Sequence, residues 1–122
     1  MNSPSKTVVL FASDLMLSST VSGFAASAGV KFQSADDISS LQAAVAGADE
    51  TLLLMDIGLP GFSAGDVAMA VPGEVLERAI AYGPHVHTEK LQAAENAGIG
   101  TVISRGRFSS QIGQLISAFA AE

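Results

Sequence analysis

The stretch LLLMDIGLPG, residues 52–61, places a single acid at the end of an apolar run. Four apolar residues lead directly into Asp56, and the turn-forming residues Gly58, Pro60 and Gly61 follow it. An apolar run without alternation is typical of a strand that is buried on both faces, as in a parallel sheet. The stretch therefore predicts a buried strand over 51–56 whose carboxyl end exposes the carboxylate of Asp56.

Similar apolar runs alternate with helical patterns along the rest of the chain. We expect strands over 6–12, 30–34, 51–56, 78–83 and 100–104. We expect helices over 14–29, 36–47, 87–98 and 109–122, and an imperfect one over 62–77 that breaks around Pro72 and Gly73. The predicted helix caps are Ser13 or Asp14, Asp36 or Asp37, and Ser109.

The order of these elements decides the fold class. Short connections between buried strands imply right-handed βαβ units, in which helices cover both faces of a parallel sheet. Five such units in 122 residues fit an α/β, flavodoxin-like three-layer sandwich with strand order 2-1-3-4-5. We expect one domain over residues 1–122, with residues 1–5 as a flexible tail.

Composition excludes several classes of function. The formal net charge is −6, and of the six basic residues only Arg105 and Arg107 lie close together, so nucleic-acid binding is not expected. The chain has no cysteine, and no apolar run approaches the roughly 18 residues of a membrane span. These features predict a cytoplasmic protein without a membrane partner. Only 15% of residues are charged, which indicates either a surface covered by a partner or simply abundant alanine and glycine.

Polar side chains and glycines follow four of the predicted strands. Because ligands of such sheets bind outside the carboxyl ends of the strands, these residues are the candidates for a pocket. We expect Asp14, Asp56 and Arg105 to converge there. The candidate pocket residues around Asp56 are Ser13, Asp14, Gly58, Gly83, His85 and Arg105.

Two stretches carry a family resemblance that covers nearly the whole chain in element order. LLLMDIGLPG resembles the third strand and following loop of response-regulator receiver domains, and AENAGIGTVISRGRF resembles their last helix–strand junction. The resemblance implies a phosphorelay module of two-component signalling, in which the Asp at the end of the third strand accepts a phosphoryl group. Asp56 takes that position here.

The rest of the receiver site differs in this chain. Receivers hold Mg²⁺ with two acids after the first strand, the acceptor Asp and a backbone carbonyl two residues beyond it. Here Ala12 and Ser13 fall on the acidic pair, and Asp14 lies one place later. Asp14, Asp56 and Gly58 are thus the possible metal ligands, and Mg²⁺ is expected to bind weakly or not at all.

Two further positions of the receiver site also depart from the family. Gly83 falls on the Ser or Thr that ends the fourth strand, and Arg105 falls on the Lys that ends the fifth. Gly83 has no hydroxyl to offer a phosphate. The positive charge of Arg105 is kept, so we expect it to pair with Asp56 directly or through water.

We interpret the chain as a stand-alone pseudo-receiver that signals through protein–protein contact, with phosphotransfer weakened or lost and no catalytic residues. The expected partner is a histidine kinase or a downstream effector, and no cofactor is expected. The protein is expected to be a monomer or a weak homodimer through the helices over 87–98 and 109–122, where exposed apolar residues should gather. Two alternatives stay open: a working phospho-acceptor that uses Asp56, and a flavodoxin-like enzyme or ligand-binding domain with its pocket at the strand ends.

Overall fold

The computed structural model describes residues 5–122, which form five strands alternating with helices. In chain order the elements are β1 (Lys6–Phe11), α1 (Leu15–Ala28), β2 (Lys31–Ala35), α2 (Ile38–Ala46), β3 (Glu50–Asp56), α3 (Ala64–Ala70), α4 (Gly73–Arg78), β4 (Ile80–Gly83), α5 (Thr88–Asn96), β5 (Thr101–Ser104) and α6 (Arg105–Ala121).

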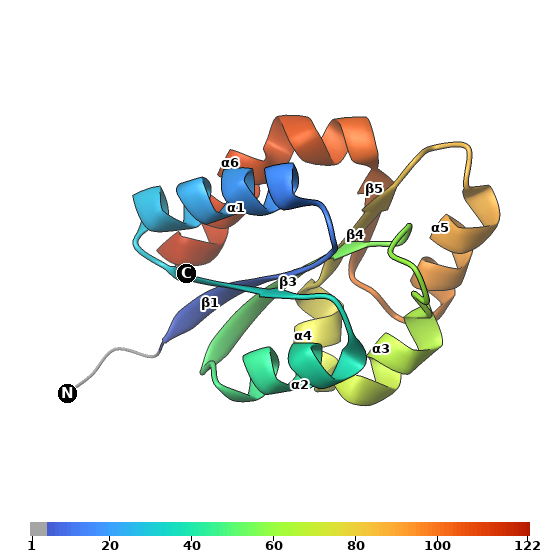
Figure 1. The fold of residues 1–122 in the computed structure, drawn as a ribbon, viewed down its shortest axis with the longest axis horizontal. Coiled ribbons are helices and arrows are strands. Elements are labelled where there is room, and N and C mark those ends of the chain that lie inside the picture. Colours follow the sequence, from blue (N-terminus) through green and yellow to red (C-terminus); the bar gives the residue numbers. More distant parts are fainter. Residues whose placement is uncertain (1–4) are drawn as a thin grey trace.

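The strands form one parallel sheet of order β2-β1-β3-β4-β5, as predicted. The central strands β1 and β3 are almost entirely buried because helices cover both of their faces. Figure 1 shows α1 and α6 on one face of the sheet and α2, α3 and α4 on the other. No helix formed by residues 5–122 combines the length and the apolar character that crossing a membrane requires.

Two apolar cores lie on the two faces of the sheet. The core under α1 and α6 joins strand residues such as Leu10 and Leu54 to Val21 of α1 and Ile116 of α6. The opposite core joins Val9, Leu53 and Met55 to side chains of α2, α3, α4 and α5. Successive strand residues point to opposite faces, so the continuous apolar runs supply both cores at once.

The predicted break in the helical stretch 62–77 is confirmed. Helix α3 ends before Val71, and Pro72 stands at the start of α4 with a φ of −59°. Proline lacks the N–H that would continue α3, but it fits the start of the next helix. Predicted caps are confirmed as well, because Asp14 caps α1 and Asp37 caps α2.

The predicted start of the last helix at Ser109 is wrong. Helix α6 begins at Arg105, and the Ser104 hydroxyl caps it by accepting a hydrogen bond from the backbone N–H of Arg107 at 3.2 Å. Ser104 is the last residue of β5, and its hydroxyl satisfies one of the free N–H groups of the first helical turn before Ser109 is reached. The earlier start moves Arg105 from a loop onto the first turn of a helix.

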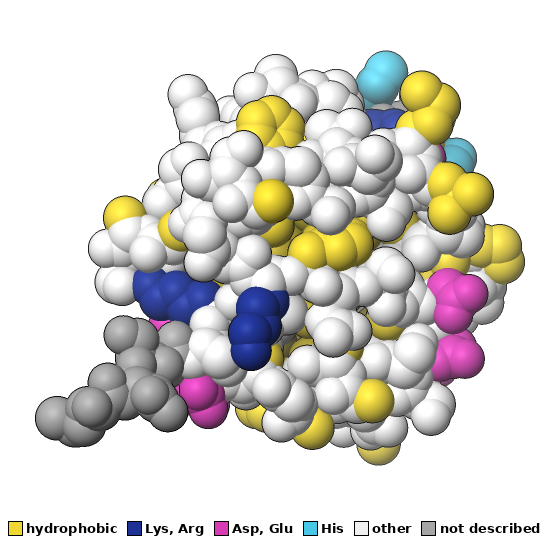
Figure 2. Space-filling model, turned by 60° about the vertical axis from the view of Figure 1, so that its left-hand side comes forward, with side chains coloured by type: hydrophobic (Ala, Val, Ile, Leu, Met, Phe, Trp, Pro, Cys, Tyr) yellow, Lys and Arg dark blue, Asp and Glu magenta, His cyan; other side chains and the backbone are white. Residues whose placement is uncertain are grey.

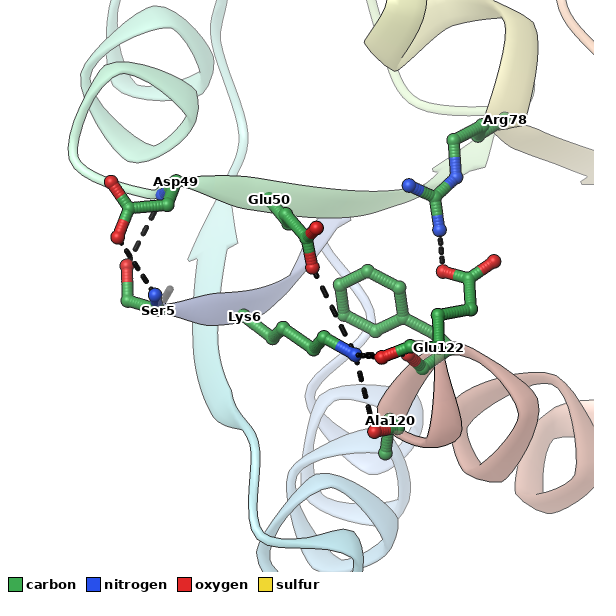
Figure 3. Close-up of polar contacts among 8 residues, drawn as sticks. Ser5, Lys6, Asp49, Glu50, Arg78, Ala120 and Glu122 are labelled. Atoms are coloured by element: carbon green, nitrogen blue, oxygen red, sulfur yellow. Dashed lines mark hydrogen bonds and ion pairs between the residues drawn. The ribbon is translucent and has the colours of Figure 1, made fainter. Parts of the chain in front are cut away.

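The amino end of the sheet is closed by polar contacts (Figure 3). The backbone N–H of Ser5 donates to Oδ2 of Asp49 at 2.7 Å, and the Ser5 hydroxyl accepts from the Asp49 N–H at 3.1 Å. The prediction of a tail over 1–5 is therefore wrong for Ser5, and residues 1–4 lie outside the described residues. Lys6 extends across to the end of α6, where its ammonium group donates to the carbonyls of Phe119 and Ala120 at 3.1 and 3.2 Å.

Candidate functional site

Asp56 lies at the carboxyl end of β3, half-buried, where the sequence predicted it. Its Oδ1 accepts a hydrogen bond from the backbone N–H of Gly58 at 2.8 Å. A second turn bond joins the Leu59 N–H to the Asp56 carbonyl at 3.1 Å. The turn that follows the strand thus folds back on the carboxylate, as an Asp side chain commonly arranges.

Asp14 follows β1, and its two carboxylate oxygens bind different groups. Its Oδ1 accepts from the backbone N–H groups of Met16 and Leu17 at 3.0 and 3.1 Å, which caps helix α1. Its Oδ2 accepts from the guanidinium of Arg105 at 2.8 Å. The Leu17 N–H, with smaller contributions from Met16 and Arg105, holds the pKa of this carboxyl below its usual value. Both carboxylate oxygens are therefore engaged by the protein itself.

Of the two forms of the expected Arg105–Asp56 pair, the direct one is not formed. Among residues 5–122 the ion pair of the Arg105 guanidinium is with Asp14, and Asp56 takes part in none. The physical reason is the early start of α6. Arg105 stands on the first turn of α6, and because α6 and α1 lie side by side on one face of the sheet, its side chain reaches the cap of α1.

The other candidate residues are spread around this edge. Ser13 is exposed and lines a shallow cavity with Asp14, and His85 is exposed on the loop after β4. Gly58 is exposed, whereas Gly83 is buried at the end of β4 and paired in register with Ser104 of β5. Asp14 and Arg105 are in direct contact, Asp56 and Gly58 form a second group, and Gly83 packs against Ile57 beside them.

Known structures share this arrangement of strands and helices. A response-regulator receiver domain from Rhodospirillum rubrum is similar with a TM-score of 0.67 and 20% identity, over 95% of this chain and 94% of that one. The chemotaxis response regulator CheY4 of Vibrio cholerae is similar with a TM-score of 0.69 and 15% identity, over 96% of this chain and 99% of that one. The fold is that of a response-regulator receiver domain.

A third similar structure contains a metal ion. The receiver domain of a sensor histidine kinase from Pseudomonas aeruginosa has a TM-score of 0.70 and 11% identity, over 97% of this chain and 99% of that one, and it contains a magnesium ion in its active-site cleft. No family model matches the sequence of the present chain, and no curated protein matches it either. The similarity to receiver domains therefore rests on structural comparison, and what it shows is the fold.

The residues of this receiver-like site do not fit a magnesium ion well. Mg²⁺ requires near-octahedral oxygen ligands, of which carboxylates are the protein's main contribution. Here Asp14 is engaged by α1 and Arg105, which leaves Asp56 and the backbone of Gly58. Within residues 5–122, no three His, Cys, Asp or Glu side chains come together as a cluster of metal ligands.

Tyr82 is a residue of this receiver-like edge that the sequence reasoning missed. It pairs in register with Asp56, is fully buried, and stacks on Phe108 of α6 with ring centroids 4.0 Å apart and planes at 1°. No described protein group bonds to its hydroxyl, and burial, with a smaller contribution from the charge of Asp56, raises its pKa. The signal in the sequence that could have identified Tyr82 is an aromatic residue directly before Gly83 at the end of a predicted strand.

Two of the cavities at the carboxyl edge of the receiver-like sheet are small and open. One of about 270 Å³ lies between the loops after β1 and β2, and another of about 260 Å³ lies between the loops after β2 and β3. Both fall below the roughly 300–1,000 Å³ typical of small-molecule sites. The flavodoxin-like enzyme alternative gains no support from them.

The exposed apolar residues are not where we expected them. Leu15 and Met16, on the first turn of α1, are 85% and 83% exposed, and Met69 of α3 is 89% exposed. Among the described residues none of the large exposed hydrophobics belongs to α5 or α6, because α6 turns its large apolar side chains into the core. Figure 2 shows hydrophobic side chains gathered at the right-hand edge of one face, beside acidic ones.

Proposed function

We propose that this receiver-like domain signals through contact with another protein and that Asp56 accepts a phosphoryl group weakly or not at all. The observation that carries the proposal is that both carboxylate oxygens of Asp14 are already hydrogen-bonded within the protein. Asp14 is the acid nearest in sequence to the expected metal-binding pair, and its two oxygens are held by the α1 backbone and by Arg105. Phosphoryl transfer depends on cations that neutralise the charge developing on the phosphate, so the loss of a metal ligand weakens it directly.

Two further features support weakened phosphotransfer. Arg105, the residue in place of the receiver lysine, is engaged by Asp14 and would have to leave that ion pair to reach a phosphoryl group on Asp56. Gly83, in place of the receiver hydroxyl, offers no side-chain donor from β4. Each change removes one of the groups that would stabilise or sense the modified aspartate.

The proposed partner is a histidine kinase or a downstream effector in the cytoplasm. In this proposal the domain is not an enzyme and needs no cofactor. Leu15 and Met16 favour a contact surface at the start of α1, in place of the α5–α6 face expected from sequence. Contiguous exposed apolar side chains that form a patch often mark protein–protein contacts. The surface lies one residue from Asp14, so a partner there would cover the candidate site.

A Mg²⁺ titration followed by ¹H–¹⁵N NMR tests the proposed loss of the metal site. The backbone amide of Gly58 is the reporter because it donates to Asp56 at 2.8 Å. We expect its resonance to shift weakly, without saturation in the low millimolar range, and equally in the wild type and in Asp56→Asn. Saturation at micromolar Mg²⁺ that disappears in Asp56→Asn would contradict the proposal.

The second candidate function, a working phospho-acceptor, is favoured by one observation. Asp56 is half-buried at the strand end, and among residues 5–122 no hydrogen-bond donor engages its Oδ2. The two candidates share the fold and differ in the fate of Asp56, which the labelling experiment at the end of the Discussion decides.

A further inference from the structure

Gly83 and Ile57 form a matched pair at the ends of the neighbouring strands β4 and β3. A Cβ atom built on Gly83 would lie 2.3 Å from Cγ1 and 2.6 Å from Cδ1 of Ile57. Real Cβ atoms essentially never approach another atom this closely. The side chain of Ile57, which is 1% exposed, therefore occupies the space that a side chain at the end of β4 would fill.

The backbone joins the same two strand ends. The N–H of Ile57 donates to the carbonyl of Tyr82 at 3.1 Å, which extends the pairing of β3 and β4 by one residue beyond Asp56. Ile57 is thus fixed to β4 both through its main chain and through its side chain. Its position between Asp56 and Gly58 means that whatever holds Ile57 also holds the two residues that form the 2.8 Å hydrogen bond.

We infer that Ile57 is a positioning residue, whose side chain takes the place of the missing β4 side chain and holds Asp56 in one orientation, turned to the Gly58 amide. A chain with a larger residue at position 83 could not seat Ile57 in this way. The glycine at position 83 therefore does more than remove the hydroxyl found there in receivers. The packing of Ile57 also requires that this position has no side chain. This inference does not depend on whether Asp56 accepts a phosphoryl group.

The packing claim predicts a sign reversal in a double-mutant cycle. In the wild type, Gly83→Ala should lower the urea midpoint because its Cβ collides with Ile57. Ile57→Ala should also lower the midpoint because it opens a cavity in a buried site. In the Ile57→Ala background, Gly83→Ala should raise the midpoint, since its methyl group enters that cavity. Equal losses from Gly83→Ala in both backgrounds would overturn the inference.

The positioning claim needs a readout that general destabilisation does not move. We expect native-state hydrogen exchange at the Gly58 amide to become about tenfold faster in Ile57→Ala, since its hydrogen bond to Asp56 then opens more often. Ile57→Val keeps the γ carbons and should leave this rate near the wild-type value. Val67→Ala removes buried carbons from the same core but from α3, so it serves as the stability control.

The control decides how the exchange result is understood. Val67→Ala should lower the urea midpoint and leave the Gly58 exchange rate within about twofold of the wild type under strongly native conditions. Unchanged Gly58 exchange in Ile57→Ala, or equal acceleration in Val67→Ala, would overturn the positioning role. The Mg²⁺ titration reports separately on the proposed function, because it measures ligand binding at Asp56 and not the mobility of its turn.

Discussion

The guanidinium of Arg105 donates to Oδ2 of Asp14 at 2.8 Å, while Oδ1 of the same carboxylate caps helix α1. One acid thus joins the first turns of α1 and α6 across the carboxyl edge of the sheet. Asp56, in contrast, is held by a backbone amide of its own turn. The positive charge of Arg105, which we expected beside Asp56, instead pairs with Asp14 and joins two helices.

Replacement of Asp14 by Asn should destabilise the protein at pH 7 in a pH-dependent way. Because the pKa of Asp14 in the folded state is lowered, its charge stabilises the fold above its unfolded pKa of about 3.9. That contribution is lost as the pH falls through the lowered pKa. Urea unfolding should therefore show a gap between wild type and Asp14→Asn at pH 7 that closes toward pH 3.

The matched control for this variant is Asp36→Asn. Asp36 is exposed, and among residues 5–122 its carboxylate takes part in no ion pair, so its replacement should change the urea midpoint little at either pH. A gap for Asp14→Asn that stays constant from pH 7 to pH 3 would show that the charge of Asp14 does not stabilise the fold.

The fold was predictable because its main signals are local. The buried strands consist of continuous apolar residues, as in TLLLMD over 51–56, and a capping acid and a glycine mark the two ends of both α1 and α2. The start of α6 was missed because the sequence pattern places Ser104 in the strand over 100–104 and leaves Ser109 as the helix cap. The difference between them is a single 3.2 Å hydrogen bond to the Arg107 amide, which becomes visible when the backbone is placed.

Gly100 is a position where a methyl group should be strongly destabilising. Its Cβ would lie 1.8 Å from the backbone carbonyl oxygen of Glu77, and its N–H donates to the Leu76 carbonyl at 3.0 Å. A backbone neighbour cannot move aside cheaply, so Gly100→Ala should cost more than about 2 kcal/mol of unfolding free energy. Chemical denaturation measures the loss.

Gly106 is the control for Gly100, because it lies in helix α6 with open space around its Cβ position. Alanine is the better helix former, so Gly106→Ala should raise the unfolding free energy by about 0.5–1 kcal/mol. If Gly100→Ala were as harmless as Gly106→Ala, the close approach of Gly100, directly before β5, to the backbone of α4 would be wrong.

Lys6, at the amino end of β1, is predicted to stabilise the end of α6 (Figure 3). Its ammonium group donates to the carbonyls of Phe119 and Ala120, and it lies 5.8 Å from the centroid of the Phe119 ring. Lys6→Met keeps the stem of the side chain and removes the donor, and it should cost about 1–3 kcal/mol. Thermal or urea unfolding checks this value.

Lys31→Met provides the comparison, since Lys31 is exposed on the edge strand β2. It should change the unfolding free energy by less than about 0.5 kcal/mol. Similar losses for both lysine variants would mean that the contacts of Lys6 with the α6 carbonyls contribute little.

The candidate site was less predictable than the fold. The sequence placed Asp14, Asp56 and Arg105 at one edge of the sheet, but it could not decide which acid the long guanidinium would reach. The answer depends on the position of α6 beside α1, a tertiary relationship. The packing of Ile57 into the place of a Gly83 side chain likewise joins two strands, and neither residue shows it alone.

Treatment of the purified protein with acetyl phosphate and Mg²⁺, followed by intact mass measurement, tests the proposed state of Asp56 most directly. The lack of a three-residue metal-ligand cluster within residues 5–122 and the pairing of Arg105 with Asp14 predict little or no added phosphoryl mass. Asp56→Asn, which keeps the acceptor for the Gly58 amide, should give the same spectrum as the wild type. Stoichiometric phosphorylation of the wild type that is abolished in Asp56→Asn would contradict the proposal and identify Asp56 as a working phospho-acceptor.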